Sequence, residues 1–246
     1  MNLNFDNIMK KIFYFIALVT LSLLFMQCET NKIGQNGVHE GHEYVDLGLS
    51  VKWATYNVGA TTPEDYGDYF AWGEMKPKDY YYWDTYKHSG DTDSTLTKYC
   101  QDKDFGLNGF VDDKIELDLE DDAAFVNWGG KWRMPTVDEF DELRYSCTWE
   151  WTTQNGVIGI LGTSRMEGYT DRTIFFPTAG MFFMDVMANV EGCEWGWYWS
   201  KSVDLNDPSS AQLLLFQTDP FGNVPEINFN YSFLRFIGAS VRAVCP

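Results

Sequence analysis

A capped helix that is followed only by strand-like runs is the feature of this sequence that most constrains its fold. Thr136 and Glu139 have the spacing of a capping box, which marks the start of a helix. Val137, Phe140 and Leu143 then place one apolar stripe along that helix. Because such a stripe must pack against another element, we expect the helix to cover a sheet.

After this helix, short runs rich in β-branched and aromatic residues are separated by Gly, Pro or Asn-Gly. The runs are residues 149–153, 157–161, 173–176, 195–203, 211–217, 233–237 and 240–244. Asn155-Gly156 predicts a hairpin turn, because both residues tolerate a positive φ. No period of about 20–50 residues repeats, which disfavours solenoids and propellers.

The part of the chain before the capped helix predicts fewer regular elements. Residues 123–128 suit a short helix that ends at two glycines, and 44–59 alternate as a half-buried strand pair. A short aromatic strand is expected at 67–74, and a loop follows it over 76–109. The fold class is therefore α+β: a single domain with two short helices packed on antiparallel sheets, and with long loops.

Composition and charge exclude two classes of partner. Hydrophobic residues make up 45% of the 246 residues and aromatics 17%, which excludes a disordered chain. The chain has 36 Asp and Glu against 18 Lys and Arg, a formal net charge of -18. Such a field repels nucleic acid and anionic lipid surfaces, and otherwise it favours the solubility of a secreted protein.

The amino terminus has the pattern of an export signal. Lys10 and Lys11 precede an apolar run over residues 12–26, too short for a membrane span and right for a signal peptide at 1–27, whether the chain starts at Met1 or Met9. Cys28 follows where bacterial lipoproteins carry their lipid, although Gln27 departs from the usual small residue. A leader without lipid and an uncleaved anchor are the alternatives. We expect lipidation at Cys28, a flexible tether over 28–42 and a folded domain over 43–246.

Four further cysteines, in an exported chain, allow two disulfides. They are Cys100, Cys147, Cys193 and Cys245, and four cysteines have three connectivities, among which the spacing does not choose. Four buried free thiols are the alternative. No Cys-x-x-Cys pair indicates zinc or redox chemistry.

Aromatic side chains are the candidate ligand contacts. Tyr81 and Trp83 belong to an aromatic cluster in the predicted loop, where they form either a platform for a sugar or peptide or a lid packed on the core. Trp195 and Trp197 share one face of a predicted strand, which could stack on sugar rings or belong to the core. We take these four side chains as the ligand-binding candidates.

An acidic stretch is the candidate metal site. Residues 112–122 contain seven Asp and Glu, and Ca²⁺ prefers such oxygen ligands. Asp118, Asp121 and Asp122 are the candidate ligands. In the alternative interpretation, residues 115–119 are a strand with one solvated face and the last acids begin a helix. The His39-Glu40-Gly41-His42 sequence lacks the spacing of a metalloprotease helix.

Six motifs resemble the Fibrobacter succinogenes major paralogous domain family. They are YVDLGLSVKWATYNVG (44–59), YFAWGE (69–74), WGGKWRMPT (128–136), FPTAG (176–180), WSKS (199–202) and GASVRAV (238–244). The resemblance implies a C-type-lectin-like fold, in the branch that includes formylglycine-generating enzymes and retroelement-diversified ligand-binding proteins. It also implies an exported lipoprotein, a structural role for Arg242, and a disulfide from Cys147 to Cys245, which would leave Cys100 with Cys193.

Enzyme motifs are missing from the sequence. No histidine follows His88, as an iron site would need, and Cys193 and Cys245 lack the copper-site motif of the formylglycine-generating relatives. Nucleophile elbow, phosphate loop and dinucleotide fingerprint are absent. We therefore expect a non-catalytic lipoprotein at the outer membrane or surface of a Gram-negative bacterium, attached only by its lipid, that binds an extracellular glycan or protein without a cofactor. A structural adhesin comes second and a glycan hydrolase third.

Overall fold

The computed structural model describes residues 36–188, 194–217 and 226–246. The predicted signal peptide, Cys28 and Cys193 lie outside these residues. None of the helices within the described ranges has the length and apolar character needed to cross a membrane.

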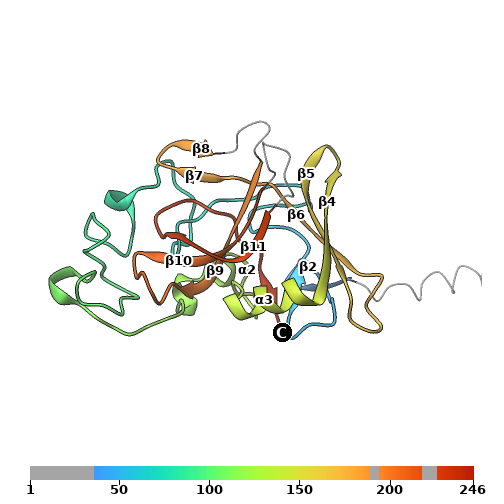
Figure 1. Cartoon of the computed structure of the whole chain (residues 1–246), viewed down its shortest axis with the longest axis horizontal. Coiled ribbons are helices and arrows are strands. Elements are labelled where there is room, and N and C mark those ends of the chain that lie inside the picture. The colour runs from blue at the N-terminus through green and yellow to red at the C-terminus, as the bar shows by residue number, and fades with distance from the viewer. Residues whose placement is uncertain (1–35, 189–193, 218–225) are drawn as a thin grey trace, which may run out of the picture. The chain divides into compact units, whose positions relative to one another are not determined.

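Over the described residues the fold is mixed α+β, with mostly antiparallel sheets and two α-helices (Figure 1). Strands β1 (Asn36–His39), β2 (His42–Val45), β3 (Lys52–Ala54) and β12 (Val244–Cys245) form one sheet in that order. The second sheet has the order β4 (Cys147–Gln154), β5 (Val157–Ser164), β6 (Thr173–Pro177). The third contains β9 (Trp195–Val203), β10 (Ser210–Gln217) and β11 (Glu226–Leu234), with β10 in the middle. A hairpin joins β7 (Met181–Phe183) and β8 (Val186–Ala188).

The helices confirm the sequence prediction. Helix α2 (Ala123–Trp128) has Asp122 as its N-cap residue, and helix α3 (Val137–Ser146) has Thr136. The predicted capping box is present, because Glu139 N donates to Thr136 Oγ1 at 3.2 Å and Thr136 N to Glu139 Oε2 at 2.9 Å. Phe140 and Leu143 of the apolar stripe pack into a core with Trp53 and Phe176. Val137, at the start of the stripe, lies outside this core.

The predicted hairpin is also confirmed. Strands β4 and β5 pair along their whole length across Asn155 (φ 46°) and Gly156 (φ 86°). Positive φ at both central residues gives the turn whose twist matches the strands. In Figure 1 this hairpin lies on the side opposite the loops of residues 74–121.

Several predicted strands are irregular instead. Residues 46–51 bend away after β2, because Gly48 adopts φ 77° and its N–H donates to Asp46 Oδ1 at 2.9 Å. The expected strand at 67–74 is reduced to one bridge, Phe70 to Ala239, and residues 240–244 pair mainly through bridges. The alternation at 115–119 does not make a strand either, since Leu119–Asp121 is a 3₁₀ turn.

The domain begins earlier than predicted, because β1 and β2 occupy part of the expected tether. His39 O accepts a hydrogen bond from Trp132 Nε1 at 2.9 Å, and the His42 ring stacks on Trp128 at 3.9 Å between centroids. These two histidines therefore tie residues 36–42 to the aromatic core. The sequence pattern missed this because their partners lie about ninety residues away.

A buried arginine connects three parts of the fold. Arg242 is fully buried, and its Nε donates to Asn57 Oδ1 at 2.9 Å. Its Nη1 donates to the carbonyl oxygens of Ala54, Thr55 and Phe175 at 3.0–3.3 Å. Burial lowers the pKa of Arg242 to about 10, so the side chain stays charged at neutral pH. This supports the structural role predicted for Arg242.

We predict that Arg242→Lys lowers the free energy of unfolding by about 2–4 kcal/mol, because an ammonium cannot reach acceptors on both sides of the planar guanidinium. Arg165→Lys is the matched control, since Arg165 is exposed and the change should stay within about 0.5 kcal/mol. Urea unfolding of both variants measures the difference. Equal stabilities would show that Arg242 does not hold these segments together.

Candidate functional site

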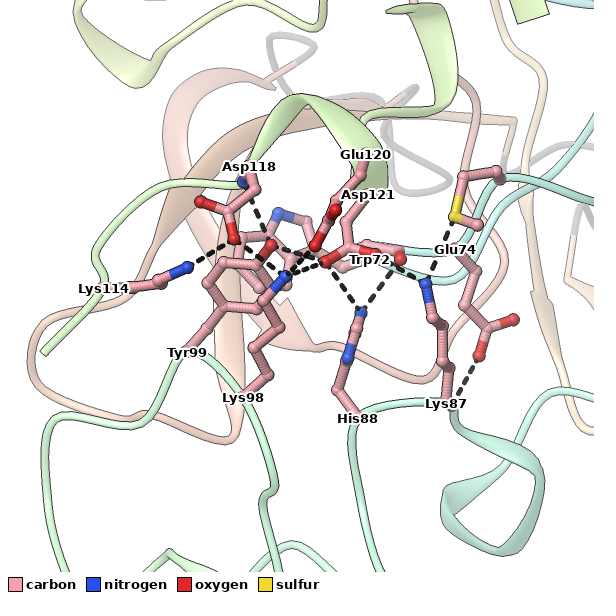
Figure 2. Close-up of polar contacts among 12 residues, drawn as sticks. Trp72, Glu74, Lys87, His88, Lys98, Tyr99, Lys114, Asp118, Glu120 and Asp121 are labelled. Atoms are coloured by element: carbon pink, nitrogen blue, oxygen red, sulfur yellow. Dashed lines mark hydrogen bonds and ion pairs between the residues drawn. The ribbon is translucent and has the colours of Figure 1, made fainter. Parts of the chain in front are cut away.

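The acidic stretch is folded around the ammonium group of a lysine (Figure 2). Lys98 Nζ lies 2.8 Å from Asp118 Oδ2, 3.0 Å from Glu120 Oε1 and 2.6 Å from Asp121 Oδ2. The 3₁₀ turn η4 (Leu119–Asp121) brings the three carboxylates together. We call Lys98, Asp118, Glu120 and Asp121 the Lys98 cluster.

Asp121 is the most connected carboxylate of the cluster, and only 3% of its surface is exposed. Its Oδ1 accepts from Lys87 Nζ at 2.6 Å, and its Oδ2 accepts from Tyr99 Oη at 2.7 Å. Burial alone would raise the pKa of Asp121, but the hydrogen bonds from Lys87, Lys98 and Tyr99 outweigh it and hold this pKa well below its usual value. Asp121 is therefore a buried, satisfied anion.

The ammonium group of Lys98 is engaged with all three carboxylates of the cluster. Partial burial lowers the pKa of Lys98, and the hydrogen bonds to Asp118, Asp121 and Glu120 more than reverse this, so its pKa lies above the usual range. The pKa of Asp118 is lowered, first by its hydrogen bond from Lys114 and then by that from Lys98. Each charge in the Lys98 cluster stabilises the opposite one.

Oxygen atoms of Asp118, Glu120 and Asp121 lie within 4.8 Å of one another, a spacing that suits a metal ion. The ammonium group of Lys98 nevertheless contacts all three side chains, so Ca²⁺ would have to displace it. Asp122 does not join them. It caps α2, accepting from Phe125 N at 3.0 Å and from Met134 N at 2.8 Å, so the predicted trio Asp118, Asp121 and Asp122 is wrong as one ligand set.

His88 packs beside this cluster and is nearly closed to solvent. Its Nε2 lies 3.0 Å from the Gly73 carbonyl oxygen, which only accepts, so Nε2 carries the proton. Burial is the main cause that lowers the pKa of His88 to about 4, although Asp121 opposes the shift. A proton on His88 is therefore unfavourable in the folded protein near neutral pH.

The predicted ligand-binding aromatics do not form an open platform. Tyr81, Trp83 and Trp197 are buried in the larger core, and Trp195 is half-buried against it. The Tyr81 hydroxyl donates to Tyr69 O at 2.7 Å, and the Trp83 ring packs on Phe236. The prediction that these side chains face a ligand is corrected for Tyr81, Trp83 and Trp197, because all three pack in the core, as the alternative interpretation of both aromatic groups had it.

The described cysteines are free thiols. Cys147 packs in the core beneath α3, whereas Cys100 and Cys245 belong to the larger core cluster. The implied disulfide from Cys147 to Cys245 is therefore not formed, since the two thiols lie in different cores. Burial raises the pKa of Cys147 to about 12 and also raises the pKa values of Cys100 and Cys245.

A groove of about 270 Å³ opens where the loop at 115–116, the start of α3 and the end of β9 meet. Aliphatic side chains of Ile115, Val137, Val203 and Leu205 line it. Leu205 is 63% exposed and Ile115 is 51% exposed. We call this groove the α3 groove. Sequence reasoning missed it, although Leu205 between Asp204 and Asn206 is an apolar residue in a polar turn.

Comparisons with known proteins gave no further assignment. No family model matches the chain, and no match was found among curated proteins or among solved structures.

We predict that Lys98→Met lowers the free energy of unfolding by about 2–3 kcal/mol. The change leaves three carboxylates close together, one of them the buried Asp121, without the cation that they share. Lys114→Met is the matched control. Lys114 is exposed and its only ion pair among the described residues is with Asp118, so the expected loss is within about 0.5 kcal/mol. Thermal and urea unfolding measure both, with and without a chelator. Equal losses, or a chelator that destabilises the unmodified protein, would contradict the lysine-centred assignment.

We also predict a pH dependence that belongs to His88. Its pKa is lowered from 6.5 to about 4 on folding, so between these values the unfolded chain binds a proton that the folded chain does not. Stability from this residue is complete above pH 6.5 and is lost as the pH falls through about 4, by about 3 kcal/mol. His88→Gln should remove this component from unfolding curves measured at pH 4 and 7. A variant with the unchanged pH dependence would refute the assignment.

Proposed function

We propose that this protein is an exported, lipid-anchored, non-catalytic domain that binds a protein ligand in the α3 groove. The observation that carries the proposal is the groove itself. Its aliphatic lining is drawn from three separate segments, and two of its members, Ile115 and Leu205, are exposed. Concave apolar surfaces with a few polar groups are the usual binding sites of folded domains.

The six family motifs support the Fibrobacter succinogenes major paralogous domain assignment and its C-type-lectin-like fold, which we include in the proposal. Each motif supplies fully buried side chains. These include Trp53, Trp72, Trp132, Phe176, Trp199 and Arg242. The motifs therefore concern the packing of the core rather than recognition of a ligand, and the function has to be argued from the surface.

A protein ligand is favoured over a glycan by the kind of surface exposed. Sugar rings stack on flat aromatic faces, and the aromatic candidates Tyr81, Trp83 and Trp197 are buried. The α3 groove instead presents branched aliphatic groups, which pack well against aliphatic side chains of a protein.

Binding rather than covalent catalysis is supported by the state of the nucleophiles. A cysteine reacts as the thiolate, and burial raises the pKa values of Cys100, Cys147 and Cys245. His88 is closed in by Gly73 and Asp121 and does not line the α3 groove. The export pattern at 1–27 and Cys28 supports attachment to the outer membrane, with the domain outside the bilayer.

The test presents the full chain, purified in mild detergent, to a glycan array and to an unrestricted library of displayed dodecapeptides. We expect peptides to be selected and glycans to fail, and Leu205→Glu to lower peptide affinity at least tenfold, because it puts a charge on the apolar wall. Tyr145→Glu is the matched control, since Tyr145 is as exposed as Leu205 and does not line the groove. Peptides that bind both variants equally, or binding confined to glycans, would contradict the proposal.

A further inference from the structure

The charged groups that line the α3 groove are all carboxylates. Glu116 and Asp138 contribute them, and no described Lys or Arg is part of the lining. Glu116 Oε2 lies 3.1 Å from Lys201 Nζ and remains 44% exposed. Asp138 is exposed, and within the described part of the chain its carboxylate has no ion pair. The groove therefore combines an aliphatic surface with two carboxylates. That of Glu116 is paired with Lys201, and that of Asp138 has no ion pair among the described residues.

The start of α3 does not turn this groove into an anion site. Two of its first three amide groups are already used, because Val137 N donates to Ser202 Oγ at 3.3 Å and Glu139 N to Thr136 Oγ1 at 3.2 Å. The Glu139 carboxylate pairs with Arg133 at 2.5 Å, so this arginine is already engaged. An anionic ligand would meet Glu116 and Asp138 without a free cation among the lining residues.

Cationic ligands are favoured by both the local and the overall charge. Asp138 and Glu116 lie beside the aliphatic wall, and the whole chain carries a formal charge of -18. The overall field draws cations toward the protein, while the two carboxylates place the attraction next to the apolar contact. The Gln212 side chain also lines the groove and offers both a donor and an acceptor to a peptide backbone.

We infer that the α3 groove binds a protein segment in which an aliphatic side chain is flanked by Lys or Arg. The aliphatic group packs among Ile115, Val137 and Leu205, and the cation pairs with Asp138. This inference rests on the proposed function and specifies the ligand of the same groove. It assigns affinity to burial of the aliphatic group and selectivity to charge.

Two restricted dodecapeptide libraries test the inference with the full chain, one without Lys and Arg and the other without Asp and Glu. We expect groove-dependent binders, defined by their loss with Leu205→Glu, only from the library that retains Lys and Arg. Their affinity should fall about tenfold with Asp138→Asn and should weaken as salt is raised. Asp93→Asn is the matched control, since Asp93 is an exposed carboxylate outside the groove.

The outcomes separate this inference from the proposed function. Groove-dependent binders that lack Lys and Arg, or that keep their affinity with Asp138→Asn, would overturn the cationic ligand and leave the protein-binding function standing. The absence of any binder sensitive to Leu205→Glu would overturn both. Binders that contain Lys or Arg and respond equally to Asp93→Asn and Asp138→Asn would reduce the effect to overall charge and would also overturn the inference.

Discussion

Arg235 and Arg242, which are buried and have no ion pair within the described residues, set the constraint on which this fold depends. A guanidinium taken out of water is costly unless its donors find acceptors, and here carbonyl oxygens from distant segments accept most of them, while Arg242 Nη2 has no hydrogen-bond partner among the described residues. Arg242 uses acceptors at Ala54, Thr55 and Phe175, so β3 and β6 must approach the last segment of the chain. Arg235 donates to Lys98 O and Tyr99 O at 3.3 and 2.6 Å, which fixes the long irregular segment against the core.

The second arginine also explains the geometry of the Lys98 cluster. Because the carbonyl groups of Lys98 and Tyr99 are held by Arg235, both side chains leave the backbone from fixed positions toward Asp121. Residues 74–121 have few strand hydrogen bonds, so charged and hydroxyl side chains take over the role that a strand ladder has elsewhere. The acidic stretch that resembles a cation site is thus part of the support of this segment, and its cation belongs to the same chain.

Local signals predicted the elements that depend on local physics. The capping box at Thr136 and the turn at Asn155-Gly156 are complete within a few residues, and both appear as expected. The sequence left open whether Tyr81 and Trp197 belong to the core. It did not predict the separation of Cys147 from Cys245 or the strands at His39 and His42, because each depends on residues far along the chain. The α3 groove belongs to the same category, since four segments line it and its local sign in the sequence is the apolar Leu205.

The pairing of β12 with β3 has a consequence for how the protein is made. Val244 lies opposite Trp53, so this strand pair joins residues about 190 positions apart. A chain made from its amino terminus cannot form the pair until the residues between β3 and β12 have been synthesised, so β3 waits without one of its final neighbours. The pairing therefore makes closure of this sheet a late event, in which folding has to bring together two distant parts of the polypeptide.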